Sequence, residues 1–478
     1  MDQCMLGGLG RGQNHSRYRS LTLRGSIVSQ INKFHQLKSG FGITKVKFTE
    51  RELINSGGTI YSYEENPSSW VYYDETPLSG YAYIQDKLEL EGMVANFGLR
   101  LDYYDPQNDP FDLGIDFEDP NAEIPSYYNS FFSEHGGYDS LRISENVSRL
   151  EFSPRLGIAH PISDVGKIYF NYGHFFQVPQ PRYYFNVRPT GASNRNVIPN
   201  LDLAWPKTIQ YEVGYEHNIN DLYLLHLGAY YKDVSDEVES FEIRSGEMGM
   251  GNLQIDTWAN NRYTDIRGIE LSLEKSTGRF FTFFATLEYS VKSWGRSGTL
   301  GIFEDPQLTE ERMDLYEQEH NNAVPAASVN LDFHTPAEYG PFWGQFYPLG
   351  GVRASLVSGW SDGGKGLYDS AAPLNARHWM EYVDWSNTDM LLEKRLMINE
   401  SEVVIYAQIT NLFNQKRLAN VQNYTSYVSS LHLPWESGTQ QGDDKYGEYN
   451  EDYLDLGWYT WTQFLNPRDV FIGIKISF

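Results

Sequence analysis

The sequence predicts an all-β protein that folds as an antiparallel transmembrane β-barrel, and three observations lead to this fold class. The chain closes with an alternating strand at 470–478, in which every even-numbered residue is apolar. The connections between the predicted strands alternate between short and long. Aromatic residues make up 15% of the chain, with 35 tyrosines, although the mean hydropathy is only −0.50.

The closing strand can present one face to lipid and the other to a polar lumen. Val470, Ile472 and Ile474 share the apolar face, whereas Gly473 and Lys475 lie on the opposite one. The chain stops at Phe478 without a polar tail, although free termini are normally polar and frayed. We therefore predict that Phe478 is an assembly signal for the barrel-assembly machinery; the last strand of a soluble β-protein is the alternative.

The composition agrees with a barrel but does not identify one. Hydrophobic residues are 40% of the chain, and no apolar run approaches the ~18 residues of a membrane helix. A barrel needs no such run because only alternate residues meet lipid, and its aromatic girdles explain the many tyrosines. A large carbohydrate-binding or propeller protein is the alternative that composition leaves open.

The charge of the chain restricts its partners. The net charge is −25, with 63 acidic and 38 basic residues, which argues against nucleic acid and against anionic inner-leaflet lipid. Acidic loops could instead bridge to divalent cations. The lone Cys4 allows neither an intrachain disulfide nor a cysteine-based metal cluster, and no cofactor is expected.

The first twenty residues contain no apolar segment after a basic start, so no signal peptide is visible. An outer-membrane protein must cross the inner membrane. Either the barrel interpretation is wrong, or the true N-terminus is missing from this sequence.

Period-2 segments bounded by turn residues predict about fifteen strands. Their approximate limits are 18–35, 38–54, 78–90, 92–104, 149–161, 166–178, 207–219, 221–234, 263–276, 279–293, 325–335, 346–360, 383–397, 401–413 and 467–478. Most of these segments reach the ~9–11 residues that a tilted strand needs to cross a bilayer.

The connections between these strands sort by length. The short ones are Gln36–Leu37, Glu91, Ile162–Val165, Asn220, Thr277–Gly278 and Ile398–Glu400, with Pro336–Gln345 intermediate; the long ones are Asn55–Pro77, Asp105–Ser148, Pro179–Pro206, Ser235–Arg262, Trp294–Val324, Ser361–Tyr382 and Asn414–Asn466. Outer-membrane barrels have short periplasmic turns and long extracellular loops, whereas soluble sandwiches rarely sort loops in this way. A periplasmic C-terminus places every long loop outside the cell.

The chain resembles a known family, the TonB-dependent outer-membrane receptors. The resemblance is carried by LysThrIleGlnTyrGluValGlyTyrGluHis and LeuGlyAlaTyrTyrLysAspValSerAsp within 206–236, ArgGlyIleGluLeuSerLeuGluLys at 267–275, IleThrAsnLeuPheAsnGlnLys at 409–416, TyrIleGlnAsp at 83–86 with GlyLeuArgLeuAsp at 98–102, and the final strand. Each motif alone is weak, but their order and spacing are specific. The resemblance covers residues 18–478.

The resemblance implies a 22-stranded barrel plugged by an N-terminal domain, in the outer membrane of a Gram-negative bacterium. Such receptors take up iron chelates, cobalamin or glycans, coupled through a TonB box to the inner-membrane motor. About 15 strands are found here, and neither plug nor TonB box, so we expect residues 18–478 to be a partial barrel and residues 1–17 an N-terminal remnant or loop. The TonB complex would act through a missing segment, and the fragment alone would not transport.

No enzyme is expected. The sequence contains no Gly-x-Ser-x-Gly, no phosphate-binding loop and no His-Glu-x-x-His. The acidic residues Asp105, Asp109 and Asp112 do not follow the EF-hand spacing. The preferred interpretation is therefore a solvated loop, with a calcium site of another kind as the alternative.

Aromatic side chains in the long loops are the candidate ligand contacts, because flat rings stack on sugars or chelates. The alternative for each is a girdle residue at the membrane interface. The candidates are Trp70, Tyr72, Tyr73, Tyr183, Tyr184, Trp435, Trp458 and Trp461.

The sequence favours the barrel of a receptor for TonB-coupled active uptake, whose extracellular ligand is not predicted. A passive porin, complete near sixteen strands, is the alternative within the membrane. A soluble all-β protein that binds sugar or calcium is the alternative outside it.

Overall fold

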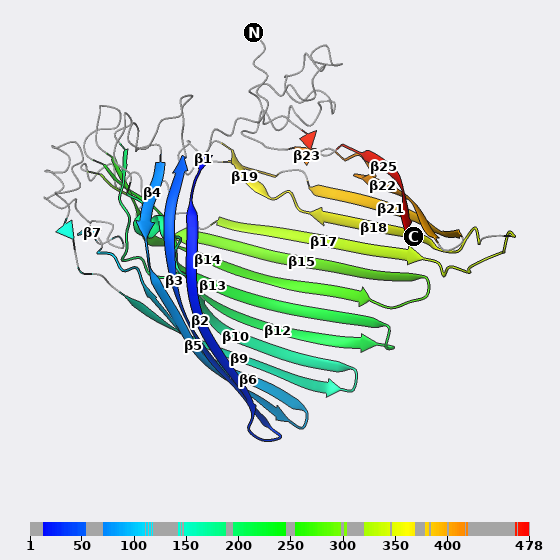
Figure 1. Ribbon diagram of the computed structural model, residues 1–478, viewed down its shortest axis with the longest axis horizontal. Helices are drawn as coiled ribbons and strands as arrows, with labels where there is room; N and C mark the ends of the chain where they lie inside the picture. The colour runs from blue at the N-terminus through cyan, green and yellow to red at the C-terminus, as the bar shows by residue number, and fades with distance from the viewer. Residues whose placement is uncertain are drawn as a thin grey trace, which may run out of the picture.

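The computed structural model shows one large antiparallel sheet (Figure 1). It describes residues 13–53, 70–109, 148–187, 195–244, 254–297, 301–303, 320–344, 347–368, 378–381, 384–398, 401–415, 417–418, 464–465 and 467–477, with a few positions between 111 and 145. No helix in these ranges has the length and apolarity needed to cross a membrane.

Nineteen strands form the sheet, and four of them are short. The long ones are β2 (Arg17–Gln30), β3 (His35–Leu53), β5 (Leu78–Leu90), β6 (Met93–Asp105), β9 (Arg149–Ser163), β10 (Gly166–Phe176), β12 (Lys207–Ile219), β13 (Tyr223–Arg244), β14 (Gln254–Lys275), β15 (Phe281–Arg296), β17 (His320–His334), β18 (Val352–Ser361), β21 (Trp385–Ile398), β22 (Ser401–Thr410) and β25 (Asp469–Ser477). Each pairs antiparallel with the next.

The remaining elements are small. The short strands of the sheet are β1 (Gln13–Asn14), β4 (Trp70–Glu75), β11 (Arg195–Val197) and β16 (Gly301–Phe303). Three two-stranded ribbons pair β7 (Phe111–Asp112) with β8 (Arg142–Ile143), β19 (Lys365–Tyr368) with β20 (His378–Glu381), and β23 (Arg417–Leu418) with β24 (Phe464–Leu465). A single turn of helix, α2 (Pro181–Phe185), follows β10.

All fifteen predicted strands are confirmed, and the connections alternate as predicted except between β13 and β14. The strand ends joined by short turns lie at one end of the sheet, and the strand ends from which the long connections leave lie at the other (Figure 1). The turn expected at Gln36–Leu37 lies instead at residues 31–34, where the Asn32 side chain accepts hydrogen bonds from the amides of Phe34 and His35 (2.8 and 3.0 Å).

Two further boundaries differ from the prediction. β18 begins at Val352 rather than at residue 346, because residues 348–351 form turns. The expected loop Ser235–Arg262 is largely strand, since β13 and β14 continue past their neighbours β12 and β15. The alternation that marks a membrane-spanning strand in the sequence does not show how far the two strands project beyond their neighbours.

The two faces of the sheet differ in chemistry. On β14, Ile269 and Leu271 are 55% and 41% exposed, and Leu271 lies opposite Leu227 and Leu287, which are exposed too. The other face is polar: Glu270 lies between Gly228 and Glu288 in the neighbouring strands. A continuous exposed apolar face backed by a polar one is what a strand wall between lipid and a wet lumen requires.

The sheet is open. Among the described residues β2 pairs only with β3, and β25 only with β22. Both edge strands are exposed along nearly their whole length, and they lie at the two ends of the curved sheet, dark blue and red in Figure 1. Unpaired edges carry free N–H and C=O groups that lipid cannot satisfy. The structure is therefore a partial barrel.

Tyrosine rings lie across from glycines on the polar face. A Cβ placed on any of these glycines would come within 2.3–2.8 Å of the opposite ring. The pairs are Gly40 with Tyr83, Gly42 with Tyr81, Gly214 with Tyr169, Gly268 with Tyr230, and Gly473 with Tyr406. Glycine gives the ring space to lie flat on the backbone, which compensates for its missing side chain.

We expect Gly214→Ala to destabilise the sheet by about 1–3 kcal/mol, as overpacking does. The new methyl would displace the Tyr169 ring, whose hydroxyl donates to Glu212 Oε1 (3.0 Å) and lies 2.7 Å from His226 Nε2. Guanidinium unfolding of the detergent-folded chain measures the effect. Gly80→Ala is the matched control, because its Cβ would meet nothing nearer than 3.4 Å. Equal midpoints for the two variants would contradict the packing argument.

Candidate functional site

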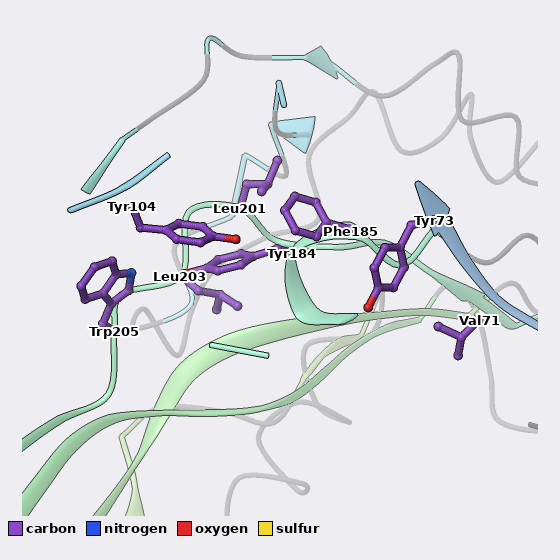
Figure 2. Close-up of a cluster of buried hydrophobic side chains, with 8 residues drawn as sticks. All are labelled: Val71, Tyr73, Tyr104, Tyr184, Phe185, Leu201, Leu203 and Trp205. Carbon is purple, nitrogen blue, oxygen red and sulfur yellow. The ribbon is translucent and has the colours of Figure 1, made fainter. Parts of the chain in front are cut away.

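A cluster of buried apolar side chains lies at the end of the sheet where the long connections gather (Figures 1 and 2). It joins β4, β6, α2 and the segment 201–205. Its members are Val71, Tyr73, Tyr104, Tyr184, Phe185, Leu201, Leu203 and Trp205. We call this set the rim cluster.

β4 enters the rim cluster because β3 extends beyond its pairing with β5. The outer half of β3 pairs with β4 instead, from Phe48 opposite Glu75 to Leu53 opposite Trp70. Val71 and Tyr73 are consequently buried on one side of this extension. Alternation along an exposed hairpin thus directs two side chains of β4 into the cluster.

α2 supplies the two central aromatics. Pro181 opens the turn, where its missing N–H costs nothing, and the Asn186 amide donates to the Arg182 carbonyl (3.2 Å). One helical turn places Tyr184 and Phe185 side by side, with 2% and 4% of their surface exposed. The turn is too short to be stable alone, so tertiary packing holds it.

The rings contact one another directly. Tyr184 stacks on Tyr104 with centroids 5.7 Å apart, and Trp205 meets Tyr104 edge-on at 6.4 Å. Phe185 meets Tyr73 at 5.9 Å. In Figure 2 the aromatic rings run across the cluster from Trp205, past the stacked Tyr104 and Tyr184, to Phe185 and Tyr73. Such aromatic contacts add about 0.5–1.5 kcal/mol each beyond area burial.

Asparagine side chains fasten the cluster to the β13–β14 hairpin. Asn200 Nδ2 donates to the Trp258 carbonyl (2.9 Å), while its own amide donates to the Tyr183 carbonyl (3.0 Å). Asn260 accepts from the Ala204 amide (2.7 Å) and donates to the Ala204 carbonyl (3.0 Å). These bonds satisfy backbone groups that would otherwise be orphaned in a buried loop.

The outer part of the β13–β14 hairpin has its own core. β11 pairs parallel with β14, and β16 parallel with β13. Phe241, Ile243 and Ile255 are fully buried. Arg296 forms a bidentate ion pair with Glu239, with N–O distances of 2.6 and 2.7 Å. The hairpin is therefore a packed projection of the rim.

Burial also sets the ionisation of the rim. It raises the pKa of the Tyr184 hydroxyl and that of Tyr73, for which the Glu50 carboxylate adds to the shift. Burial is the main cause that raises the pKa of the Glu75 carboxyl, and the negative charge of Asp74 adds to it. The Glu75 carboxyl accepts a hydrogen bond from Asn108 (3.1 Å). The two tyrosines thus stay neutral.

The structure divides the predicted ligand contacts into three groups. Trp70, Tyr73 and Tyr184 are buried and act in packing. Tyr72 and Tyr183 are half-buried; the Arg51 guanidinium lies 5.2 Å from the Tyr72 ring, and Tyr183 packs on Trp258 at 4.3 Å. The remaining predictions, Trp435, Trp458, Trp461 and the assembly signal Phe478, lie outside the described residues.

Sequence reasoning missed Tyr104 and Trp205, which are central to the cluster. Leu201, Leu203 and Trp205 alternate within a segment ending at Pro206, a pattern that signals a packed strand-like stretch inside a long loop. Tyr104 was assigned to a membrane strand and gave no separate signal.

The rim cluster packs β4, β6, α2 and the segment 201–205 against one another. Within the described ranges, no group of three His, Cys, Asp or Glu side chains could hold a metal ion. Asp105 and Asp109, which do not follow the spacing of a calcium loop, are among the described residues and form no such group.

Comparisons with known proteins agree with this architecture. The family model described as TonB dependent receptor-like, beta-barrel matches residues 5–412. No curated protein matches the chain. Among solved structures, the chain is similar to a mutant of the ferric enterobactin receptor PfeA of Pseudomonas aeruginosa in complex with enterobactin, with a TM-score of 0.54 and 15% identity over 96% of this chain and 54% of that one.

Two other solved structures share the fold. The FrpB iron transporter of Neisseria meningitidis has a TM-score of 0.51 and 10% identity, covering 84% of this chain and 52% of its own. A double mutant of the hemophore receptor HasR of Serratia marcescens, in complex with HasA and heme, has a TM-score of 0.51 and 14% identity, covering 85% and 57%. The chain thus spans about half the length of these structures. The family match, together with the wall of antiparallel strands, shows that the chain belongs to the TonB-dependent receptor β-barrel family.

Proposed function

We propose that this chain forms most of the wall of an outer-membrane receptor for TonB-coupled active uptake of a large ligand, of the iron-chelate, cobalamin or glycan class. The observation that carries the proposal is the sheet itself, with an exposed apolar face, a polar face and all long connections at one end. That arrangement suits a lumen wall with an extracellular ligand-binding rim.

The free edges of β2 and β25 limit what the sheet can do alone. We propose that further strands must pair with both edges before a closed, transporting barrel exists, so that the isolated sheet is inactive. Partners would then be outer-membrane lipid, the barrel-assembly machinery and the TonB complex.

The outer aromatics remain the proposed ligand contacts. Among the described ones, Tyr72 and Tyr183 still present part of their rings to solvent, whereas the buried ones would act by shaping the rim. The similar structures bind enterobactin or heme, or are named iron transporters. Ferric chelates and heme are therefore the first probes to try.

Active uptake predicts that accumulation depends on energy. Cells expressing the complete gene product that contains this chain should accumulate the radiolabelled ferric chelate it accepts, and a protonophore or deletion of the TonB protein should reduce accumulation to surface binding. Cells carrying the empty vector are the control. Accumulation that survives both treatments would instead indicate a passive pore. Recovery of the chain in the soluble fraction without detergent would end the barrel proposal.

A further inference from the structure

One connection at the short-turn end is much longer than its neighbours. Residues 335–351 join β17 to β18, whereas residues 31–34, 91–92 and 164–165 suffice for other turns at that end. We call residues 335–344 and 347–351 the inner loop. Its length is not needed to reverse the chain, so another role has to explain it.

The inner loop lies against the apolar face of the sheet. Lys394 belongs to that face, since it pairs with Val352 and Ile405 and shares its side of β21 with Leu392. Its Nζ donates to the carbonyls of Tyr347 (2.8 Å), Pro348 (3.1 Å) and Gly350. An ammonium has three N–H donors, so the loop satisfies all of them. A charged group on this face needs such partners.

The loop is also fixed internally. Thr335 Oγ1 donates to the Leu349 carbonyl (2.6 Å) and accepts from the Val352 amide (3.0 Å). The Phe342 ring packs on Tyr347 at 5.2 Å, so the apolar tip is tied to the segment that holds Lys394. A left-handed Gly351 (φ +64) turns the chain back into β18.

This ordered loop nevertheless exposes large apolar side chains. Phe342 is 58% exposed, Trp343 70% and Leu349 53%. We propose that the inner loop is a membrane-interface anchor, in which Phe342, Trp343 and Leu349 insert into the headgroup boundary of a phospholipid leaflet and the Lys394 ammonium lies at phosphate level.

Two observations favour phospholipid as the occupant. The exposed side chains belong to the loop whose carbonyls bind Lys394 on the apolar face, which is the face that meets lipid along the spanning strands. The cation beside them complements lipid phosphate, although the protein as a whole is acidic. Tryptophan, phenylalanine and lysine are the residues that interfaces favour. The proposal rests on the proposed membrane location of the sheet.

A spin label tests the anchor in the full chain. In a Cys4→Ser background, Trp343→Cys is labelled with a nitroxide, and the protein is reconstituted in phosphatidylethanolamine–phosphatidylglycerol vesicles. Collisions with oxygen, which concentrates in lipid, and with a water-soluble nickel chelate are compared. We expect the label to prefer oxygen. Asp221→Cys, in the short turn after β12, is the control for a water-exposed position. Leu287→Cys, on the apolar face, is the control for a lipid-exposed position.

The controls separate the two proposals. If position 287 meets lipid but position 343 is as open to nickel as position 221, the anchor is wrong and the barrel stands. If the label at position 287 is itself accessible to the nickel chelate, the proposed membrane location of the sheet is wrong, whatever the result at position 343.

Lys394→Met tests the attachment of the loop. It removes the donor that holds three carbonyls, and we expect the water-accessible population of the label at 343 to rise on the order of tenfold. Unchanged accessibility would overturn the role assigned to Lys394. A label at 343 that was already water-accessible before this substitution would overturn the anchor itself.

Discussion

Tyr184→Ala is expected to loosen the outer rim while the spanning sheet stays folded. The Tyr184 ring is 2% exposed and stacks on Tyr104, so its removal leaves a cavity in the centre of the rim cluster. Replacing a buried aromatic by alanine costs about 3–5 kcal/mol. Hydrogen exchange should show residues 181–187 and 195–206 opening, while amides of β22 keep their protection.

Tyr72→Ala is the matched control, because Tyr72 is half-buried and its contact is with the Arg51 guanidinium at the surface. We expect its exchange pattern to stay within ~0.5 kcal/mol of the parent, as for surface substitutions. Equal protection of residues 181–187 and 195–206 in the two variants would refute the packing role of Tyr184. Loss of ligand binding in Tyr72→Ala alone would favour Tyr72 as a ligand contact.

Leu271→Arg is expected to destabilise the membrane-inserted protein by about 2–4 kcal/mol, the cost of a cation on the lipid face at mid-depth. Leu271 lies on the apolar face, opposite Leu227 and Leu287 in the two neighbouring strands. Folding of the full chain into lipid vesicles, followed by guanidinium titration, measures the loss.

Ser272→Arg moves the same charge by one residue onto the polar face. There the guanidinium meets water and the nearby Glu270 and Glu274 carboxylates, so little change is expected. Because a strand alternates its faces, this pair of variants tests the face assignment directly. Similar losses from both would mean that Leu271 does not face lipid.

The sequence predicted the spanning strands well because alternation is a local property. Ile209, Tyr211 and Val213 alternate with polar residues in the sequence, and the structure places all three in β12 as predicted. The turn at 31–34 was misplaced because its residues Ile31 and Phe34 are apolar and fit a strand pattern. The turn depends on hydrogen bonds to the Asn32 side chain, which the alternation does not show.

The rim could be predicted only in part. Aromatic residues in long loops pointed to Tyr73 and Tyr184, but sequence could not tell stacking on a ligand from stacking on Tyr104. That distinction depends on contacts between segments far apart in the chain, such as Asn200 with Trp258. Burial of this kind follows from tertiary packing, which alternation does not encode.

The two free edges have a geometric consequence for how the barrel closes. Every pair of neighbouring long strands is antiparallel, and the long strands are odd in number, so β2 and β25 both run toward the short-turn end. If the sheet closed on itself, these two strands would form the one parallel pair in an otherwise antiparallel wall. A fully antiparallel circle requires an odd number of additional strands between them.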